Sequence, residues 1–253
     1  MITPQRYGPW AVVTGASFGI GREIAIQLAS AGLSLVLVAR REDLLAQLAA
    51  TLPTETLVIP LDLAAPGAPS SLLARTAALP VGLLVNAAGF GSGGAFLDTD
   101  PVAESQMVDV NCRAVLELTH GFARRFAAQR RGGIVLFSSI VATQGVPRSA
   151  NYAATKAYVH SLAEALADEL APHGVDVLAS APGPTDSGFA HRAGMTMANA
   201  ESPVRVARDT LAALGRRRLV VPGSLAKLLT AGLAVTPRFL RVQIMKQVMK
   251  SMT

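Results

Sequence analysis

The sequence predicts an α/β fold in which a mainly parallel sheet of about seven strands is covered by helices on both faces. Short apolar runs of strand length alternate with longer segments of helical periodicity along most of the chain. A glycine-rich turn follows the first apolar run, and a later run ends in two serines. This alternation is typical of a doubly wound, Rossmann-type sheet, which binds ligands beyond the carboxyl ends of its strands.

Length and composition fit one large domain, which we expect to span residues 1–221 and to be followed by a helical tail over residues 222–253. The 253 residues are 51% hydrophobic and 16% charged, enough to bury a core without disulfides or metals. The single cysteine, Cys112, predicts no internal disulfide and fits a reducing cytosol, and no metal-ligand cluster is visible. Residues Met1–Pro9 lack a signal-peptide core, and no uncharged apolar run reaches the ~20 residues that cross a bilayer. We therefore expect a cytoplasmic protein.

The net charge of +6 comes from one end of the chain. Eight basic residues and no acidic ones lie between Arg216 and Thr253. The rest of the chain carries 15 basic and 17 acidic residues, a balance of −2. Because the catalytic body is not basic, we do not expect nucleic acid as a partner.

The first strand, Trp10–Thr14, leads into a glycine turn and a helix over Arg22–Ala31. Glycines there let the backbone approach a pyrophosphate, whose charge is favoured by the free amides and the positive dipole end of the helix. A purely structural turn is the alternative interpretation. The candidate contacts in the turn are Gly15, Ser17, Phe18, Gly19, Ile20 and Gly21.

The second strand, Leu33–Ala39, ends where an NAD-selective protein would place an acid against the ribose hydroxyls. Ala39 stands there instead, and Arg40 and Arg22 offer planar donors for a 2′-phosphate. The alternative is that these arginines are solvated, with Arg40 at the start of the next helix, Glu42–Ala50. The pattern favours NADP.

Two further strands, Thr56–Leu61 and Gly82–Val85, deliver residues to the same edge of the sheet. The first is followed by Asp62-Leu63, although Asp62 would also suit a plain turn. The second is followed by Asn86-Ala87-Ala88-Gly89, whose small side chains allow a ligand to lie close.

The reactive groups are predicted from a serine and a helical Tyr–Lys pair. The strand Gly133–Ser139 ends in Ser139, and the helix Ala150–Leu170 carries Tyr152 and Lys156 on one face. A free tyrosine ionises near pH ~10, and a nearby ammonium lowers that pKa. A surface Tyr–Lys pair and a serine that merely ends a strand are the alternatives.

With these motifs in this order and spacing, the sequence resembles the short-chain dehydrogenase/reductase family from Trp10 to about Val221. The motifs are Thr14-Gly15-x-x-x-Gly19-x-Gly21, Asn86-Ala87-Ala88-Gly89, Ser139, Tyr152-x-x-x-Lys156 and, after a sixth strand, Pro182-Gly183-Pro184-Thr185-Asp186-Ser187. Ser187 replaces the threonine usual in the family, and its hydroxyl keeps the hydrogen-bond donor.

The resemblance implies four catalytic roles. Tyr152 would be the general acid or base, and Lys156 would lower its pKa and hold the nicotinamide ribose. Ser139 would hydrogen-bond the carbonyl oxygen of the substrate. Asn111, at the junction of two predicted helical segments, would anchor a water that links Lys156 to solvent, although a helix-capping role is compatible with this.

The resemblance also implies NADP(H) as the cofactor and no metal. Asp62 and Leu63 would contact the adenine, and the Pro182–Ser187 segment would line the nicotinamide carboxamide and pyrophosphate. The full set of candidate cofactor contacts is Gly15, Ser17, Phe18, Gly19, Ile20, Gly21, Arg22, Arg40, Asp62, Leu63, Asn86, Ala87, Gly89, Tyr152, Lys156, Pro182, Gly183, Thr185 and Ser187.

The implied activity is interconversion of a ketone or aldehyde and an alcohol by hydride transfer. The substrate is expected to be a small, apolar carbonyl or alcohol, and the assembly a homo-dimer or homo-tetramer. One alternative is a 3-oxoacyl reductase acting on carrier-protein or CoA thioesters, with Arg130 meeting the acidic carrier. From another class, the alternatives are an NADP-binding sensor or scaffold without turnover, and a membrane-surface protein.

Two segments near the end of the chain are harder to interpret. Residues 188–202 lack periodicity, as expected for a mobile substrate lid. The tail after Val221 predicts two helices broken at Pro237, with apolar positions at Leu225, Leu228, Leu229, Leu233, Leu240, Ile244 and Val248. Packing on the body or on another subunit, a lid role, and a weak contact with a membrane surface remain open for this tail.

Overall fold

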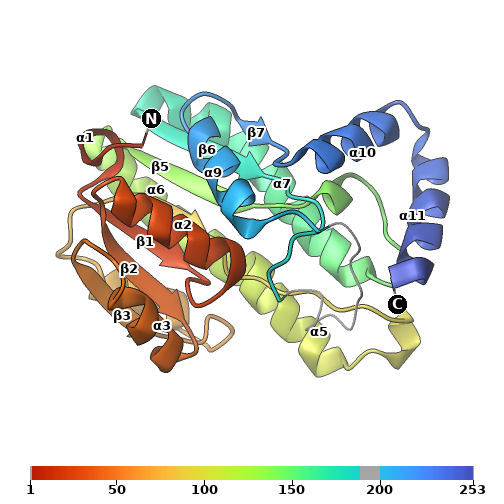
Figure 1. The fold of residues 1–253 in the computed structure, drawn as a ribbon, viewed down its shortest axis with the longest axis horizontal. Helices are drawn as coiled ribbons and strands as arrows, with labels where there is room; N and C mark the ends of the chain where they lie inside the picture. The colour runs from red at the N-terminus through yellow and green to blue at the C-terminus, as the bar shows by residue number, and fades with distance from the viewer. Residues whose placement is uncertain (1, 189–199, 253) are drawn as a thin grey trace.

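A computed structural model describes residues 2–188 and 200–252 of the chain. One seven-stranded sheet has the order β3-β2-β1-β4-β5-β6-β7, and all neighbouring strands are parallel (Figure 1). The strands are β1 (Trp10–Thr14), β2 (Ser34–Ala39), β3 (Thr56–Pro60), β4 (Val81–Asn86), β5 (Gly132–Phe137), β6 (Val175–Ser180) and β7 (Leu219–Val220). The strand order reverses between β1 and β4, the switch point at which such sheets open a ligand crevice.

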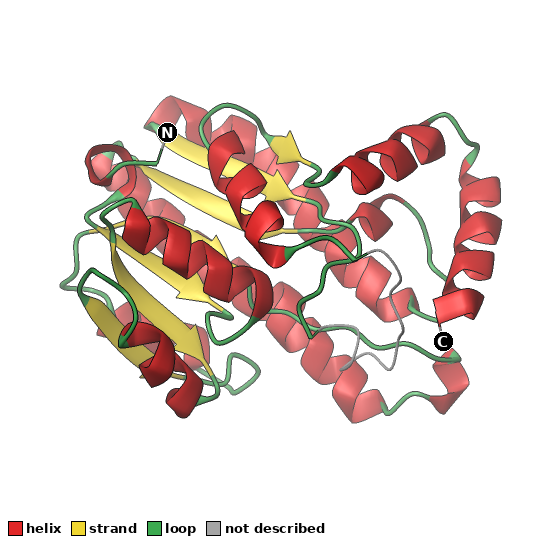
Figure 2. Ribbon diagram, in the orientation of Figure 1, coloured by secondary structure: helices red, strands yellow, loops and turns green. Residues whose placement is uncertain are grey.

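Helices cover both faces of the sheet (Figure 2). They are α1 (Pro4–Tyr7), α2 (Gly19–Ser30), α3 (Glu42–Ala49), α4 (Ala68–Arg75), α5 (Pro101–Val108), α6 (Ala114–Gln129), α7 (Ala150–Leu170), α9 (Pro203–Ala213), α10 (Ser224–Ala234) and α11 (Arg238–Met252). Short 3₁₀ turns lie at Phe96–Asp98, Ile140–Thr143 and Ala171–His173, and a π turn spans Asp109–Arg113. The predicted doubly wound α/β class is confirmed.

The hydrophobic core has two layers, one on each face of the sheet. The face of the sheet that carries Val13 packs against α2, α3 and α9. The opposite face, which carries Val12, packs against α4, α6 and α7. Successive strand residues therefore enter opposite layers, and β1 is buried along its whole length. Burial on both faces explains why these strands are continuous apolar runs in the sequence.

Some boundaries differ from the prediction for local reasons. The sequence predicts that the helical segment before Asn111 begins at Leu97, but it begins at Pro101, because proline suits the first helical position and the Asp100 carboxylate accepts the Val102 amide at 3.0 Å. The helix expected from Arg22 begins at Gly19, inside the glycine turn. Asn111 lies in the π turn of a continuous helix rather than at a break.

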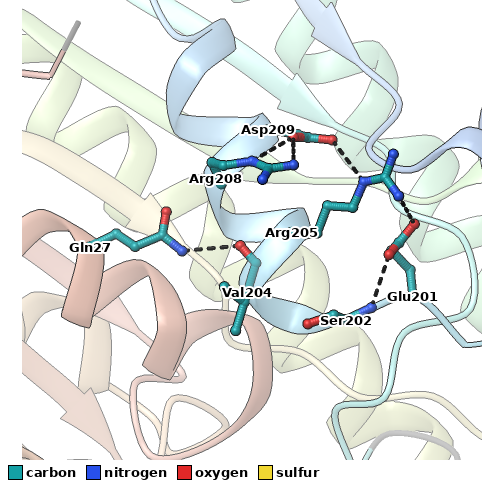
Figure 3. A network of polar contacts seen from close by, with 7 residues as sticks. All are labelled: Gln27, Glu201, Ser202, Val204, Arg205, Arg208 and Asp209. Carbon is teal, nitrogen blue, oxygen red and sulfur yellow. Dashed lines mark hydrogen bonds and ion pairs between the residues drawn. The ribbon is translucent and has the colours of Figure 1, made fainter.

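Polar contacts fix the chain where it returns to the body at residue 201. Gln27 of α2 donates to the Val204 carbonyl at 3.1 Å, and Arg205 pairs with the Glu201 carboxylate at 3.5 Å (Figure 3). The backbone of Glu201 also bonds to Pro184 and Asp186. These bonds hold the far end of the predicted lid, most of which, residues 189–199, lies outside the described residues.

The tail forms two helices, α10 and α11, beside α7 (Figure 1). In α10, Ala226 is buried. In α11, Met245 and Met249 are buried against Val146 and Ala153. The tail thus packs on the body next to the start of the catalytic helix. Within residues 2–188 and 200–252, each helix is too short or too polar to cross a bilayer.

Candidate active site

A cavity of about 770 Å³ opens at the carboxyl ends of the central strands. Its volume is in the range of small-molecule and cofactor sites. The predicted residues that line it are Gly15, Ser17, Phe18, Gly19, Ile20, Gly21, Arg40, Asp62, Leu63, Ala87, Gly89, Tyr152, Lys156, Pro182 and Ser187. Residues from six separate segments of the chain therefore meet in one cleft.

The glycine turn forms the floor of this cleft by direct backbone packing. Gly15 has a φ of +69°, and a Cβ there would lie 2.8 Å from the Ala88 amide nitrogen. A Cβ at Gly21 would collide with the Gly15 carbonyl. Thr14 fixes the neighbouring strand, because its Oγ1 accepts the Ala88 amide at 3.1 Å. A side chain at either glycine would therefore push apart the backbone that shapes this floor.

The segment after β6 closes the other side of the turn. A Cβ at Gly19, where φ is +55°, would lie 2.6 Å from the Ser187 Cβ. Gly183 and Thr185 do not line the cavity, although both were predicted cofactor contacts. Gly183 faces Ala226 of α10, and Thr185 bridges to Glu201. The structure places them behind the cleft wall, where they hold the Pro182–Ser187 segment.

Two other predicted contacts point elsewhere. The Arg22 guanidinium pairs with the Glu23 carboxylate at 3.0 Å and does not line the cavity. The buried Asn86 amide donates to Thr119 Oγ1 at 3.1 Å and thereby ties β4 to α6. At the end of β2, Arg40 lines the cavity as predicted and Arg41 joins it. A basic site at this strand end is therefore built from Arg40 and Arg41.

Tyr152 and Lys156 line the cleft, and Ser139 lies beside Tyr152 without lining the cavity itself. Ser139 hydrogen-bonds the Tyr152 hydroxyl. Lys156 is 7% exposed and lies one helical turn further on, with Nζ 5.7 Å from the centre of the Tyr152 ring. Its ammonium donates to the Phe137 carbonyl at 2.9 Å. The predicted triad is thus assembled from the end of β5 and the first two turns of α7.

Asn111 joins this group through the loop after β4. Its Oδ1 accepts the Phe90 amide at 3.1 Å, and its Nδ2 donates to the Phe90 carbonyl at 2.9 Å and to Thr155 Oγ1 at 3.0 Å. A Cβ at Gly89 would lie 3.1 Å from Asn111 Oδ1 and 3.4 Å from Lys156 Nζ. Asn111 and Lys156 therefore approach the same point. A π turn at such a position is typical of functional sites.

Burial sets the protonation of the Tyr–Lys pair. It raises the pKa of Tyr152 to about 12, and the Ser139 hydrogen bond offsets only part of this rise. Burial lowers the pKa of Lys156 to about 8. In this structure the expected lowering of the Tyr152 pKa by Lys156 is outweighed, because desolvation disfavours both charged forms. At neutral pH Tyr152 keeps its proton and is ready to act as an acid.

The cleft also contains residues that the sequence analysis did not identify. They are Val38, Arg41, Leu61, Ala64, Phe90, Gln106, Val110, Phe137, Ser138 and Gly188. Most of them lie next to a strand end or to a predicted contact in the sequence. Their position beside those residues is the only sequence feature that could have indicated them. Gln106 and Val110 come from α5 and its π turn, and only the tertiary fold brings them to the cleft.

A second hollow, of about 460 Å³, lies at the opposite ends of β5 and β6. Its basic lining residues are Arg6, Arg131, Arg216, Arg217 and Arg218. It holds none of the predicted site residues and none of the carboxyl strand ends.

A glycine cradle at the switch point of a parallel sheet, joined to a Ser–Tyr–Lys group, defines a nucleotide-binding oxidoreductase class. The chain matches the short chain dehydrogenase family over residues 9–198. The chain therefore belongs to this family.

Relatives and solved structures agree with this family. The chain is 40% identical over 179 residues to a very-long-chain 3-oxoacyl-CoA reductase of Podospora anserina, covering 67% of this chain and 53% of that protein. It is 34% identical over 177 residues to a 7beta-hydroxysteroid dehydrogenase of Collinsella aerofaciens, covering 68% of this chain and 67% of that protein. The chain thus spans about half the length of the 3-oxoacyl-CoA reductase.

Two solved structures extend the likeness to the whole fold. A 7beta-hydroxysteroid dehydrogenase structure has a TM-score of 0.88 at 27% identity, covering 97% of this chain and 99% of that chain. A short-chain dehydrogenase from Sphingobium yanoikuyae in complex with NADPH has a TM-score of 0.79 at 28% identity, covering 91% and 96%. The first of these covers nearly all of this chain, so its likeness reaches into the tail.

The buried charge of Lys156 gives a stability prediction. A pKa lowered from 10.5 to about 8 corresponds to a cost of about 3 kcal/mol for folding with the charged amine. Lys156→Met removes that cost and loses one hydrogen bond, so we expect the free energy of unfolding at pH 7 to rise by about 2 kcal/mol. Denaturant unfolding measures it, with the exposed Lys227→Met as the control.

The pH dependence follows from the direction of the same shift. Between pH 8 and 10.5 the unfolded chain binds more protons at Lys156 than the folded protein, so the stability of the parent rises through this window. The difference in unfolding free energy between Lys156→Met and the parent should therefore narrow as pH rises. The proposed cost of the buried ammonium would be wrong if Lys156→Met were less stable than the parent at pH 7. It would also be wrong if the difference in unfolding free energy between the two proteins did not change with pH.

Proposed function

We propose that the chain is an NADP(H)-dependent oxidoreductase that interconverts a carbonyl and an alcohol. The observation that carries this proposal is the Ser139–Tyr152 hydrogen bond beside Lys156, in the same cleft as the glycine cradle. The turn suits a dinucleotide, because its glycines line the cleft and let the backbone approach a pyrophosphate. Structures of similar dehydrogenases described with NADPH or NADP support the choice of cofactor.

The residues of this chain supply acid–base chemistry and orientation. When bound, NADPH supplies the hydride for carbonyl reduction. Tyr152 donates its proton to the carbonyl oxygen, and Ser139 holds that oxygen by a hydrogen bond. Lys156 stabilises the phenolate left behind, because its ammonium lies one turn away on the same helix. Asn111 holds the water through which the proton is replaced.

Cofactor choice is assigned to the end of β2. Ala39 leaves no carboxylate to repel a 2′-phosphate, and Arg40 and Arg41 line the cleft beside it. Asp62 and Leu63, after β3, lie on the same side for the adenine. Arg22 is engaged by Glu23, so Arg40 is the main phosphate contact in this proposal.

The substrate class is proposed to be a bulky, apolar ketone or the matching alcohol. Relatives named for hydroxysteroids and for very-long-chain 3-oxoacyl-CoA both support a bulky apolar substrate. The buried Met245 and Met249 of α11 pack against Ala153, the neighbour of Tyr152. The second candidate, a 3-oxoacyl thioester reductase, is favoured by the 40% identity to the Podospora protein.

The wider context is proposed on weaker grounds. We assign a cytoplasmic location and a homo-dimer or homo-tetramer, with the domain boundary near residue 221. Exposed apolar side chains on α5 and α6, such as Val102 and Leu116, support an assembly of subunits. A weak membrane contact of the basic tail is a competing use of α10 and α11.

Tyr152→Phe tests the assigned acid. Only one hydroxyl is deleted, so we expect NADPH still to bind while the rate of carbonyl reduction falls at least ~10²-fold. NADPH oxidation is followed with 3-oxoacyl thioesters, steroids, small ketones, aldehydes and quinones. Tyr158→Phe, on the same helix but 39% exposed, is the control. Near-normal turnover by Tyr152→Phe on any substrate of the parent would show that Tyr152 is not the acid.

Arg40→Asp tests the cofactor assignment. It places a carboxylate against the 2′-phosphate, and losing a charge-assisted contact costs roughly 1.5–3 kcal/mol of NADPH binding. We expect the parent to prefer NADPH and the variant to lose or reverse that preference, as measured by titration of both cofactors by fluorescence. The control is Arg124→Asp, an exposed site on α6. Equal affinities of the parent for NADPH and NADH would refute the role of Arg40.

Truncation after Pro237 tests the tail as a substrate wall. It removes α11 and its contacts with Val146 and Ala153 but leaves α10 in place. We expect unchanged NADPH affinity and a drop of about 10-fold or more in kcat/KM on bulky apolar substrates, the worth of a few lost apolar contacts. The truncated protein could instead keep the kinetics of the parent and its molecular mass in light scattering, but lose binding to anionic liposomes. That result would show that α11 contacts a membrane surface and does not shape the substrate site.

A further inference from the structure

One carboxylate beside the cleft has no part in the proposed mechanism. Glu104 of α5 uses both of its oxygens: Oε1 accepts the Ser92 hydroxyl at 2.6 Å, and Oε2 accepts the Asn151 side-chain amide at 2.7 Å. The Asn151 amide also donates to the Glu104 backbone carbonyl at 2.9 Å. Hydrogen bonds this short to a carboxylate are the stronger, charge-assisted kind.

These three residues, Ser92, Glu104 and Asn151, form what we call the rim clamp. Its two donors come from different segments, Ser92 from the loop after β4 and Asn151 from the first turn of α7. Ser92 lies two residues after Phe90, which Asn111 holds, and Asn151 directly precedes Tyr152. Glu104 therefore fixes the loop after β4 and the first turn of α7 relative to each other.

Two further hydrogen bonds connect the same segments. Ser149 Oγ donates to the Ser92 carbonyl at 3.0 Å, and the Gly94 amide donates to the Arg148 carbonyl at 2.9 Å. Arg148 has a φ of +69°, a conformation that a residue other than glycine seldom adopts. Strained backbone of this kind is held by its surroundings and is concentrated at functional sites.

A role in an ion pair does not explain Glu104. Among residues 2–188 and 200–252, no arginine, lysine or histidine forms a salt bridge with it. Its charge is stabilised by neutral donors from the two cleft walls. On the same helical stretch, Gln106 and Val110 line the cleft and Asn111 reaches Phe90, so α5 positions several parts of the site at once.

We propose that Glu104 is a positioning residue for carbonyl reduction: it holds the Tyr152 end of α7 against the loop after β4, so that the phenol meets the carbonyl oxygen of the substrate. This inference rests on the proposed function. A misplacement of about 1 Å at a reacting group costs on the order of 10²-fold in rate. A clamp on the residue next to the acid therefore acts on turnover rather than on cofactor binding.

The test begins with Glu104→Gln, which keeps the shape of the side chain but leaves one oxygen acceptor for two donors. We expect kcat for carbonyl reduction to fall by about 10-fold or more, while the NADPH dissociation constant and the melting temperature stay at the parent values. Glu169→Gln, an exposed carboxylate on α7, is the matched control and should leave kcat unchanged.

A rescue variant separates positioning from a general loss of structure. In Glu104→Gln combined with Asn151→Asp, the amide donor and the carboxylate acceptor change places, and the remaining Gln oxygen can still accept Ser92. We expect kcat to recover in part, because the carboxylate of Asn151→Asp then faces the Glu104 backbone carbonyl, which accepts the Asn151 amide at 2.9 Å in the parent. Recovery in the pair, with no gain from Asn151→Asp alone, supports the clamp.

Three results overturn the proposal. If the kcat of Glu104→Gln equals that of the parent, the rim clamp does not affect turnover. A loss of kcat that the double variant does not recover shows that the bonds to Asn151 are not the cause. A loss of kcat accompanied by lost NADPH binding and a lower melting temperature shows a structural role only. A parent that binds NADPH but reduces no carbonyl instead defeats the proposed function, and the positioning role with it.

Discussion

The removal of water from Tyr152 and Lys156 is the constraint on which the rest of the site depends. Burial disfavours the charged form of each group and moves the two pKa values in opposite directions, up for the phenol and down for the ammonium. A fold that buries these groups must hold them by other bonds. The Phe137 carbonyl receives the ammonium, and Ser139 bonds the phenol. The result at neutral pH is a protonated acid beside a cation, the arrangement that carbonyl reduction requires.

The sheet makes this arrangement possible by ending its strands in one place. The switch between β1 and β4 opens a crevice, and close backbone packing at Gly15 and Gly21 shapes its floor, because a Cβ at either position would meet backbone. The π turn then brings Asn111 against the loop after β4, close to Lys156. Backbone packing thus positions the glycine turn, whereas side-chain hydrogen bonds hold Asn111 and Lys156.

Much of the fold and the site was readable from the sequence because the signals are local. Strand and helix alternate with clear periods, the turn residues are glycines, and Tyr152 and Lys156 share a helical face by their spacing. A sequence does not display which of the predicted contacts also bond within the protein. Arg22 is engaged by its neighbour Glu23, Asn86 by Thr119, and Gly183 and Thr185 by the segments behind the wall. Gln106 and Glu104 carry no local signal, and the pKa of Tyr152 depends on burial that a sequence does not display.

The central claim is that this cleft transfers a hydride between a nicotinamide and a carbonyl carbon, with the proton coming from the protein. The most direct measurement uses NADPH carrying deuterium in both positions at C4 of the nicotinamide and a ketone that the parent reduces. Mass spectrometry and NMR of the alcohol then locate the label. Our account predicts one deuterium on the carbinol carbon and a solvent proton on the oxygen. An alcohol without deuterium on that carbon, or NADPH consumption with no alcohol formed, would contradict it.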